Sequence, residues 1–132
     1  MTILTGLVAH YQASAGLTAL CANRFYPVTS PQNPTYPYIL FQRISIGQRA
    51  GSHSGDSLLE QARFQFTING KTAMSADAVR EQLIAAFVGF AGMMGDVYVS
   101  GITLANDIDD YDPITFAYKR NVDLMLWYRP QA

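Results

Sequence analysis

The chain has 132 residues, the length of a single domain, so residues 1–132 are expected to fold as one unit. Its net charge of −1 supplies no basic surface for gripping nucleic acid, and its longest apolar run, residues 83–95, is too short to span a bilayer. Charged residues are only 14% of the chain, against about 25% in an average soluble protein, which favours either self-association or a surface rich in Thr, Ser and Gln.

An N-terminal helix is predicted by apolar residues that recur at three- and four-residue spacing, with Thr2 placed to cap it. The residues on this apolar face are Ile3, Leu4, Leu7, Val8 and Tyr11. Ala15 and Gly16 end the helix, and residues 17–22 form a second short turn. Cys21, the lone cysteine, forms no internal disulfide and is expected to be a small core residue.

A proline-rich loop and two strands follow. The prolines at positions 27, 31, 34 and 37 exclude regular structure, although residues 24–26 can add a short edge strand. Residues 38–46 form a strand with apolar side chains on both faces, so we expect it to be covered on two sides. The cleaner alternation in residues 59–69 predicts a strand with one buried face. The buried side chains of this second strand are Ala62, Phe64, Phe66 and Ile68.

The segment between these strands has little to anchor it. Residues 47–57 contain three glycines, three serines and no apolar side chain beyond Ala50, so we expect a flexible loop or a functional arm. Ser52, His53 and Asp56 have the residue types of a hydrolytic triad. Triad members must be held rigidly by different elements, which neighbours on such a loop are not, so His53 is interpreted as a solvated loop residue.

The C-terminal half predicts one helix and two strands. Residues 73–90 carry an apolar stripe on a helix capped by Thr72 or Ser75, and strands are expected at 97–104 and 116–128. The charged residues of the helix, Asp77, Arg80 and Glu81, are expected to be solvated. The resulting order is helix, strand, strand, helix, strand, strand. It predicts an α+β fold in which an antiparallel β-sheet packs with two main helices.

Four of the ten acidic residues gather at positions 107, 109, 110 and 112. The spacing fails as an EF-hand because Asp112 occupies the position that requires glycine. A looser metal site is the less favoured alternative to a turn before the last strand, with Asp112 and Pro113 as turn residues and a role in contacts. No other pattern indicates a metal, a cofactor or a catalytic set, so an enzyme is not expected.

Short aromatic and proline motifs stand along the chain in a particular order. They are Arg24-Phe25-Tyr26-Pro27, Ser30-Pro31-Gln32, Tyr36-Pro37-Tyr38 before a strand, and Asp110-Tyr111-Asp112 before the last strand. Combined with a single mid-chain helix, this order resembles the tail completion, or tail terminator, proteins of long-tailed bacteriophages. The resemblance covers most of the chain, from the N-terminal helix to the last strand.

The resemblance implies a homohexameric ring in the virion, at the junction of head and tail. Such a ring ends tail-tube polymerisation and offers a surface to the head connector. The implied partners are other copies of the chain, the tail tube protein and the connector protein, while DNA only passes through the channel and no cofactor or membrane is involved. Assembly in the host cytoplasm fits an N-terminus without the positive region of a signal peptide. The alternatives are a related neck or connector completion protein and a small monomeric α+β ligand-binding module.

Seven residues are the expected contacts with a neighbouring subunit or with the tube. They are Gln48, Arg49, His53, Asp110, Asp112, Met125 and Trp127. Met125 and Trp127 lie on the polar-patterned face of the last strand, where an aromatic side chain is a typical interface anchor. The other face of that strand holds Val122, Leu124 and Leu126. The alternative for Met125 and Trp127 is a second core layer under a helix.

Overall fold

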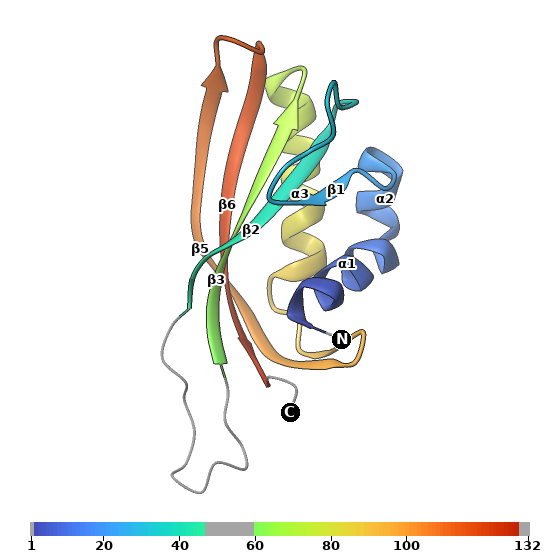
Figure 1. Cartoon of the computed structure of the whole chain (residues 1–132), viewed down its shortest axis with the longest axis vertical. Helices are drawn as coiled ribbons and strands as arrows, with labels where there is room; N and C mark the ends of the chain where they lie inside the picture. Colours follow the sequence, from blue (N-terminus) through green and yellow to red (C-terminus); the bar gives the residue numbers. More distant parts are fainter. Residues whose placement is uncertain (1, 47–59, 130–132) are drawn as a thin grey trace, which may run out of the picture.

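A six-stranded sheet with three helices on one of its faces forms the described part of the chain (Figure 1). The computed structural model describes residues 2–46 and 60–129. The helices are α1 (Ile3–Ala13), α2 (Ala15–Cys21) and α3 (Ala73–Phe87). The strands are β1 (Phe25–Pro27), β2 (Tyr38–Ile46), β3 (Glu60–Gly70), β4 (Gly92–Met94), β5 (Val97–Asp112) and β6 (Ala117–Tyr128). None of the described helices is long and apolar enough to cross a membrane.

The strands are ordered β1-β2-β3-β6-β5-β4 across the sheet. The central strands β3 and β6 pair antiparallel along the whole of β3, from Glu60 opposite Tyr128 to Gly70 opposite Tyr118. The other neighbouring strands also pair antiparallel, except that β1 runs parallel to β2. The α+β class is therefore confirmed. The short turn predicted at residues 17–22 and the edge strand predicted at 24–26 correspond to α2 and β1, whereas the predicted order lacks β4. The sheet is mixed rather than purely antiparallel.

Side-chain caps fix where the helices begin. Thr2 and Thr5 form a reciprocal capping box at the start of α1, in which each hydroxyl accepts a hydrogen bond from the backbone N–H of the other residue. Ser14 caps α2, and the hydroxyl of Thr72 accepts a bond from the backbone N–H of Ser75 at 3.0 Å. The cap predicted at Thr2 is confirmed, and Thr72 is the cap of α3.

The core lies between the helices and one face of the sheet. Phe64, Phe66 and Leu124 have no exposed surface, in agreement with the alternation in β3 and β6, and Cys21 is also fully buried. Aromatic rings stack from α1 towards the sheet, with centroids 4.4 Å apart between Tyr11 and Phe25 and again between Phe25 and Phe41. Such pairs add about 0.5–1.5 kcal/mol each beyond the burial of their area, so the stack ties the N-terminal helix to β2.

Helices cover one face of β2, and on the other face only its start is covered, where Tyr38 is 8% exposed and its ring packs against those of Tyr26 and Tyr36. The prediction that β2 is covered on two sides therefore holds at its start and is wrong further along the strand. Ile39 and Phe41 point into the core, whereas Leu40 is half-buried and Gln42 and Ile44 are exposed. The helices lie over the first of these faces (Figure 1). The second face of β2 therefore leaves apolar side chains available to another chain.

We expect Phe66→Ala to lower the free energy of unfolding by about 3–5 kcal/mol, because it removes a fully buried ring and leaves a cavity. Gln65→Ala is the matched control, since Gln65 is the neighbouring residue of β3 and points to the open face. This control should change stability by no more than about 0.5 kcal/mol. Urea denaturation of both variants measures the difference, and equal losses would contradict the assignment of the two faces.

Candidate functional site

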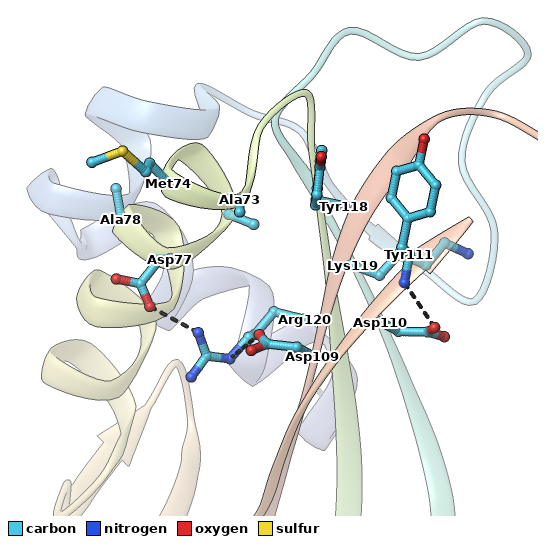
Figure 2. Close-up of a pocket in the computed structure, with 11 residues that line it drawn as sticks. Ala73, Met74, Asp77, Ala78, Asp109, Asp110, Tyr111, Tyr118, Lys119 and Arg120 are labelled. Atoms are coloured by element: carbon cyan, nitrogen blue, oxygen red, sulfur yellow. Dashed lines mark hydrogen bonds and ion pairs between the residues drawn. The ribbon is translucent and has the colours of Figure 1, made fainter. Parts of the chain in front are cut away.

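A groove separates the first half of α3 from the distal half of the β5–β6 hairpin (Figure 2). It is open to solvent and has a volume of about 870 Å³. Small side chains of α3, among them Ala73 and Ala78, form one wall. The hairpin supplies the other wall with Asp109, Asp110, Tyr111, Tyr118, Lys119 and Arg120. Charged and aromatic side chains from segments far apart in the sequence thus meet here.

Ion pairs join α3 to the hairpin beside this groove. The Oδ1 atom of Asp107 on β5 lies 2.8 Å from Nε of Arg120, and its Oδ2 lies 2.7 Å from Nη2 of Arg80 on α3. Arg120 also reaches Asp77 on α3 at 2.8 Å (Figure 2). Partial burial alone would raise the pKa of the Asp107 carboxyl, but the hydrogen bonds from Arg120 and Arg80 outweigh it and hold the pKa below its usual value. Asp107 is therefore charged at neutral pH, and its ion pairs with Arg80 and Arg120 fix the hairpin against α3.

The acidic residues form a strand and not a turn, which corrects the prediction. Residues 107–112 belong to β5 and pair with β6 throughout. The turn spans residues 113–116, where the Asp112 carboxylate accepts hydrogen bonds from the backbone N–H of Ile114 at 3.0 Å and from the Thr115 hydroxyl at 2.9 Å. These bonds hold the pKa of the Asp112 carboxyl below its usual value. Asp112 thus supplies turn chemistry, as predicted, at the end of a longer strand than predicted.

The tip of the hairpin exposes large apolar side chains. Ile114 is 86% exposed and Phe116 is 71% exposed. Next to them the rings of Tyr111 and Tyr118 pack with centroids 4.9 Å apart, and Met74, on the α3 wall of the groove, is 84% exposed. Apolar groups gathered on one projecting element are typical of a protein contact surface.

The sheet face away from the helices carries polar pairs. On this open face, Nη2 of Arg63 lies 2.8 Å from Oδ2 of Asp123, and the Thr67 hydroxyl donates to Oδ1 of Asn121 at 3.0 Å. Asp123 is only 4% exposed, and its Oδ1 has no hydrogen-bond donor among the described residues. A buried carboxylate oxygen without a donor costs free energy that a donor from another chain recovers.

The predicted contact residues fall on two different surfaces. Met125 and Trp127 are half-buried on the open face of the sheet, so within the described residues no helix covers them as a second core layer. Asp110 is exposed on β5, where its carboxylate accepts a bond from the Tyr111 backbone N–H at 2.7 Å, and Asp112 caps the hairpin turn. The predicted contacts Gln48, Arg49 and His53, and the predicted loop 47–57, lie outside the described residues.

Sequence reasoning missed the arginines of the network and the aromatic tip. Asp77 and Glu81 are exposed on α3 as predicted, although Asp77 also bonds to Arg120 of the hairpin. Arg80, predicted to be solvated, has a side chain that is only 22% exposed and bonds to Asp107. Asp77 and Arg80 are three residues apart, so they lie on one face of α3, and Asp107 and Asp109 are two residues apart, so they lie on one face of a strand. This matching spacing of charges could have indicated the ion pairs from the sequence. Phe116 was predicted to begin the last strand, whereas it lies in the turn with a φ of 58°.

Basic side chains pair with three members of the acidic cluster in the described structure. Asp107 and Asp109 are held by Arg120, and Asp112 lies 3.9 Å from the Lys119 ammonium. Among residues 2–46 and 60–129, no group of three or more His, Cys, Asp and Glu side chains is placed to hold a metal ion. The cluster therefore acts in the described chain as a partner for basic side chains.

One family model and two solved structures are similar to this chain. The family model of tail completion protein gp17 matches residues 5–129. A chain from the virion of a native gene transfer agent particle has a similar structure, with a TM-score of 0.72 at 15% identity over 96% of this chain and 94% of that chain. A second solved structure has a TM-score of 0.62 at 17% identity over 100% of this chain and 99% of the other. A search of curated proteins gave no significant match. At these identities the two structures show a shared fold.

We expect Asp107→Asn to lower the free energy of unfolding by about 1–3 kcal/mol at neutral pH, because it weakens charged hydrogen bonds to two arginines. Asp109→Asn is the control; its side chain is 80% exposed, so its ion pair with Arg120 should contribute less than about 1 kcal/mol.

The loss in Asp107→Asn should depend on pH. Because the folded pKa of Asp107 is lowered, its contribution is complete above the unfolded pKa of about 3.9 and disappears as the pH falls through the folded value. Denaturation of the variant and the unmodified protein from pH 7 to pH 2 measures this. A stability difference that stayed constant over the whole range would show that packing, and not charge, accounts for it.

Proposed function

The chain belongs to the tail completion protein gp17 family and is a structural component of the virion tail, and from this premise we propose that it closes the end of the tail tube as a ring. The ring ends polymerisation of the tube and presents the surface that joins the head connector. Its partners are further copies of the chain, in a homohexamer of single-domain subunits, the tail tube protein and the connector protein. The proposal includes no catalytic step and no cofactor.

The surface of the described subunit supports such an assembly. Only one face of the sheet is covered by helices, and the hairpin tip exposes Ile114 and Phe116. A solitary domain rarely leaves large apolar side chains together on a projecting element, whereas a subunit buries them against its neighbours. The observation that carries the proposal is the family match over residues 5–129. The exposed hairpin tip and the open sheet face are surfaces through which a subunit could contact its partners.

The charge distribution suits a duct through which DNA passes. The net charge is −1, and the arginines that the open face and the groove display are paired with carboxylates, Arg63 with Asp123 and Arg120 with Asp107. Affinity for DNA comes mainly from unpaired cations that displace counterions from the phosphates. Because their charges are paired, these arginines of the open face and the groove offer the passing duplex little to bind.

Two surfaces are proposed to contact other subunits or the tube. Met125 and Trp127 are the anchors on the open face, beside the Asp123 carboxylate oxygen that has no donor among the described residues. Asp110 and Asp112 belong to the projecting hairpin. On the sequence alone, the proposed contacts also include Gln48, Arg49 and His53.

Native mass spectrometry and negative-stain imaging of the full chain, alone and with tail tubes, test the proposal. Rings at tube ends support it. A ring that binds the isolated connector and never the tube would favour the neck-protein alternative. A protein that remains monomeric at high concentration and never joins tubes would contradict the proposal and favour a monomeric binding module.

We expect Trp127→Ala to leave the thermal midpoint close to that of the unmodified protein and to impair tail completion, because the side chain lies on the open face and not in the core. Tails assembled with this variant should be overlong or lack heads. Electron microscopy of tail length and head attachment provides the measurement, with Gln65→Ala on the same face as the control. If Trp127→Ala unfolds the protein as severely as Phe66→Ala, the contact assignment is wrong.

A further inference from the structure

Two strands of the sheet have outer edges that are only partly paired within the described residues. On β5, the strand β4 pairs with Val97–Val99, and the backbone N–H of Gly89 donates to the carbonyl of Ile102 at 2.9 Å. Beyond Ile102, no described backbone group pairs with this edge. On β2, the strand β1 pairs with Ile39–Phe41, and the described residues give residues 42–46 no partner on the outer side. Free strand edges are templates for pairing with another chain.

On part of the β5 edge, side chains of β5 itself accept hydrogen bonds from the backbone N–H groups. The side chain of Asn106 accepts a hydrogen bond from the backbone N–H of Asp107 at 2.9 Å, and that of Asp110 accepts one from Tyr111 at 2.7 Å. These donors are already satisfied, so a strand placed there would gain less. Residues 103–105 have no such cap among the described hydrogen bonds, which leaves this stretch as the open part of the edge.

The two open stretches lie at the same level across the sheet. Arg43 of β2 is opposite Phe64 of β3, Phe64 is opposite Leu124 of β6, and Leu124 is opposite Leu104 of β5. The three antiparallel pairings from β2 to β5 also make these two strands run in opposite directions. A rotation that brings the β5 edge of one copy against the β2 edge of the next therefore places Leu104 beside Arg43, in antiparallel orientation.

The backbone N–H and C=O groups of Leu104 and Arg43 point outward from the sheet, where a strand of another copy could pair with them. The carbonyl of Ile102 bonds outward to Gly89, and the carbonyl of Phe41 bonds outward to Val28 at 2.9 Å. Because backbone groups alternate along a strand, those of Leu104 and Arg43, two residues further on, also point outward. Both side chains are exposed, with Leu104 at 42%.

We infer that the subunits of the ring are joined edge to edge, with Leu104 of β5 in one copy paired to Arg43 of β2 in the next copy, so that the sheets form one continuous closed sheet. This inference rests on the ring of the proposed function. A second copy is the occupant because one junction uses both open edges of the same chain at matching level and direction. Head-to-tail contacts form a ring when the rotation between copies closes, and in such a ring neither stretch is left unpaired.

Cross-linking of the full chain tests the junction. We expect the Arg43→Cys and Leu104→Cys double variant to give a ladder of covalent oligomers with a short bismaleimide, because hydrogen-bonded neighbours in antiparallel strands are about 5.5 Å apart. Within one copy the two positions are three strand spacings apart, about 14 Å, so the bond forms between copies. Cys21 contributes little background, since it is fully buried and burial raises the pKa of its thiol to about 11.

The control pairs Arg43→Cys with Ile114→Cys, which is more exposed than Leu104 but lies at the hairpin tip. Rings that form by mass and imaging without stronger cross-linking of the Arg43 and Leu104 pair than of this control would overturn the junction and leave the proposed function standing. A protein that forms no ring with or without tubes would overturn both.

A charge contrast at one exposed position gives a second test without cysteines. Leu104→Arg places two arginines opposite each other across the junction, and like charges directly opposite weaken strand pairing. Leu104→Glu places a carboxylate opposite Arg43 instead. We expect Leu104→Arg to lose most of its rings and Leu104→Glu to keep them, with both monomers equally stable. Equal ring formation by the two variants would contradict the pairing.

Discussion

A β-sheet needs its apolar face covered, and in the described part of this chain three helices cover one face and leave the other open. The central strands β3 and β6 bury Phe64, Phe66 and Leu124 completely under that cover. The ring stack from Tyr11 to Phe41 fixes α1 over β2. Every surface available for assembly follows from this one-sided arrangement: an open sheet face, two partly paired edges and a hairpin that projects past the cover.

Ion pairs, more than apolar contacts, hold the projecting part of the β5–β6 hairpin against α3. Asp107 is bonded by Arg80 from α3 and by Arg120 from β6, so one carboxylate joins the helix and both strands of the hairpin. Compared with apolar residues of similar size, partly buried pairs of this kind add little net stability because desolvation offsets the attraction, although removing one partner is costly. Their geometry, however, is specific. The hairpin is thereby held in one orientation before any partner arrives, which lowers the ordering cost of binding through its tip.

The sequence predicted those parts of the fold that one-sided burial dictates. Alternation placed β3 and the core face of β6 correctly, because their apolar residues recur with period two under a single cover. The acid-rich end of β5 has no such pattern; it is a strand because β6 pairs with it and arginines neutralise Asp107, both of which are tertiary effects. The same alternation placed Met125 and Trp127 on the outer face, whereas Ile114 and Phe116 lie in a turn, where no periodicity exists to indicate exposure.

The chain combines a low content of charged residues with partly open strand edges, and this combination must be kept from uncontrolled edge pairing. A free strand edge is an aggregation hazard, more so when it carries few charges. On the distal part of β5, the side chains of Asn106 and Asp110 accept hydrogen bonds from the following backbone N–H groups, which makes this part a poorer template for another strand. The irregular pairing after Leu104 adds local twist, and so does the irregularity after Arg43 in β2, at the same level of the sheet. Twist and curvature of this kind favour closure over open stacking. A subunit built in this way restricts edge pairing to one short stretch, which the proposed ring uses and an unlimited flat sheet does not favour.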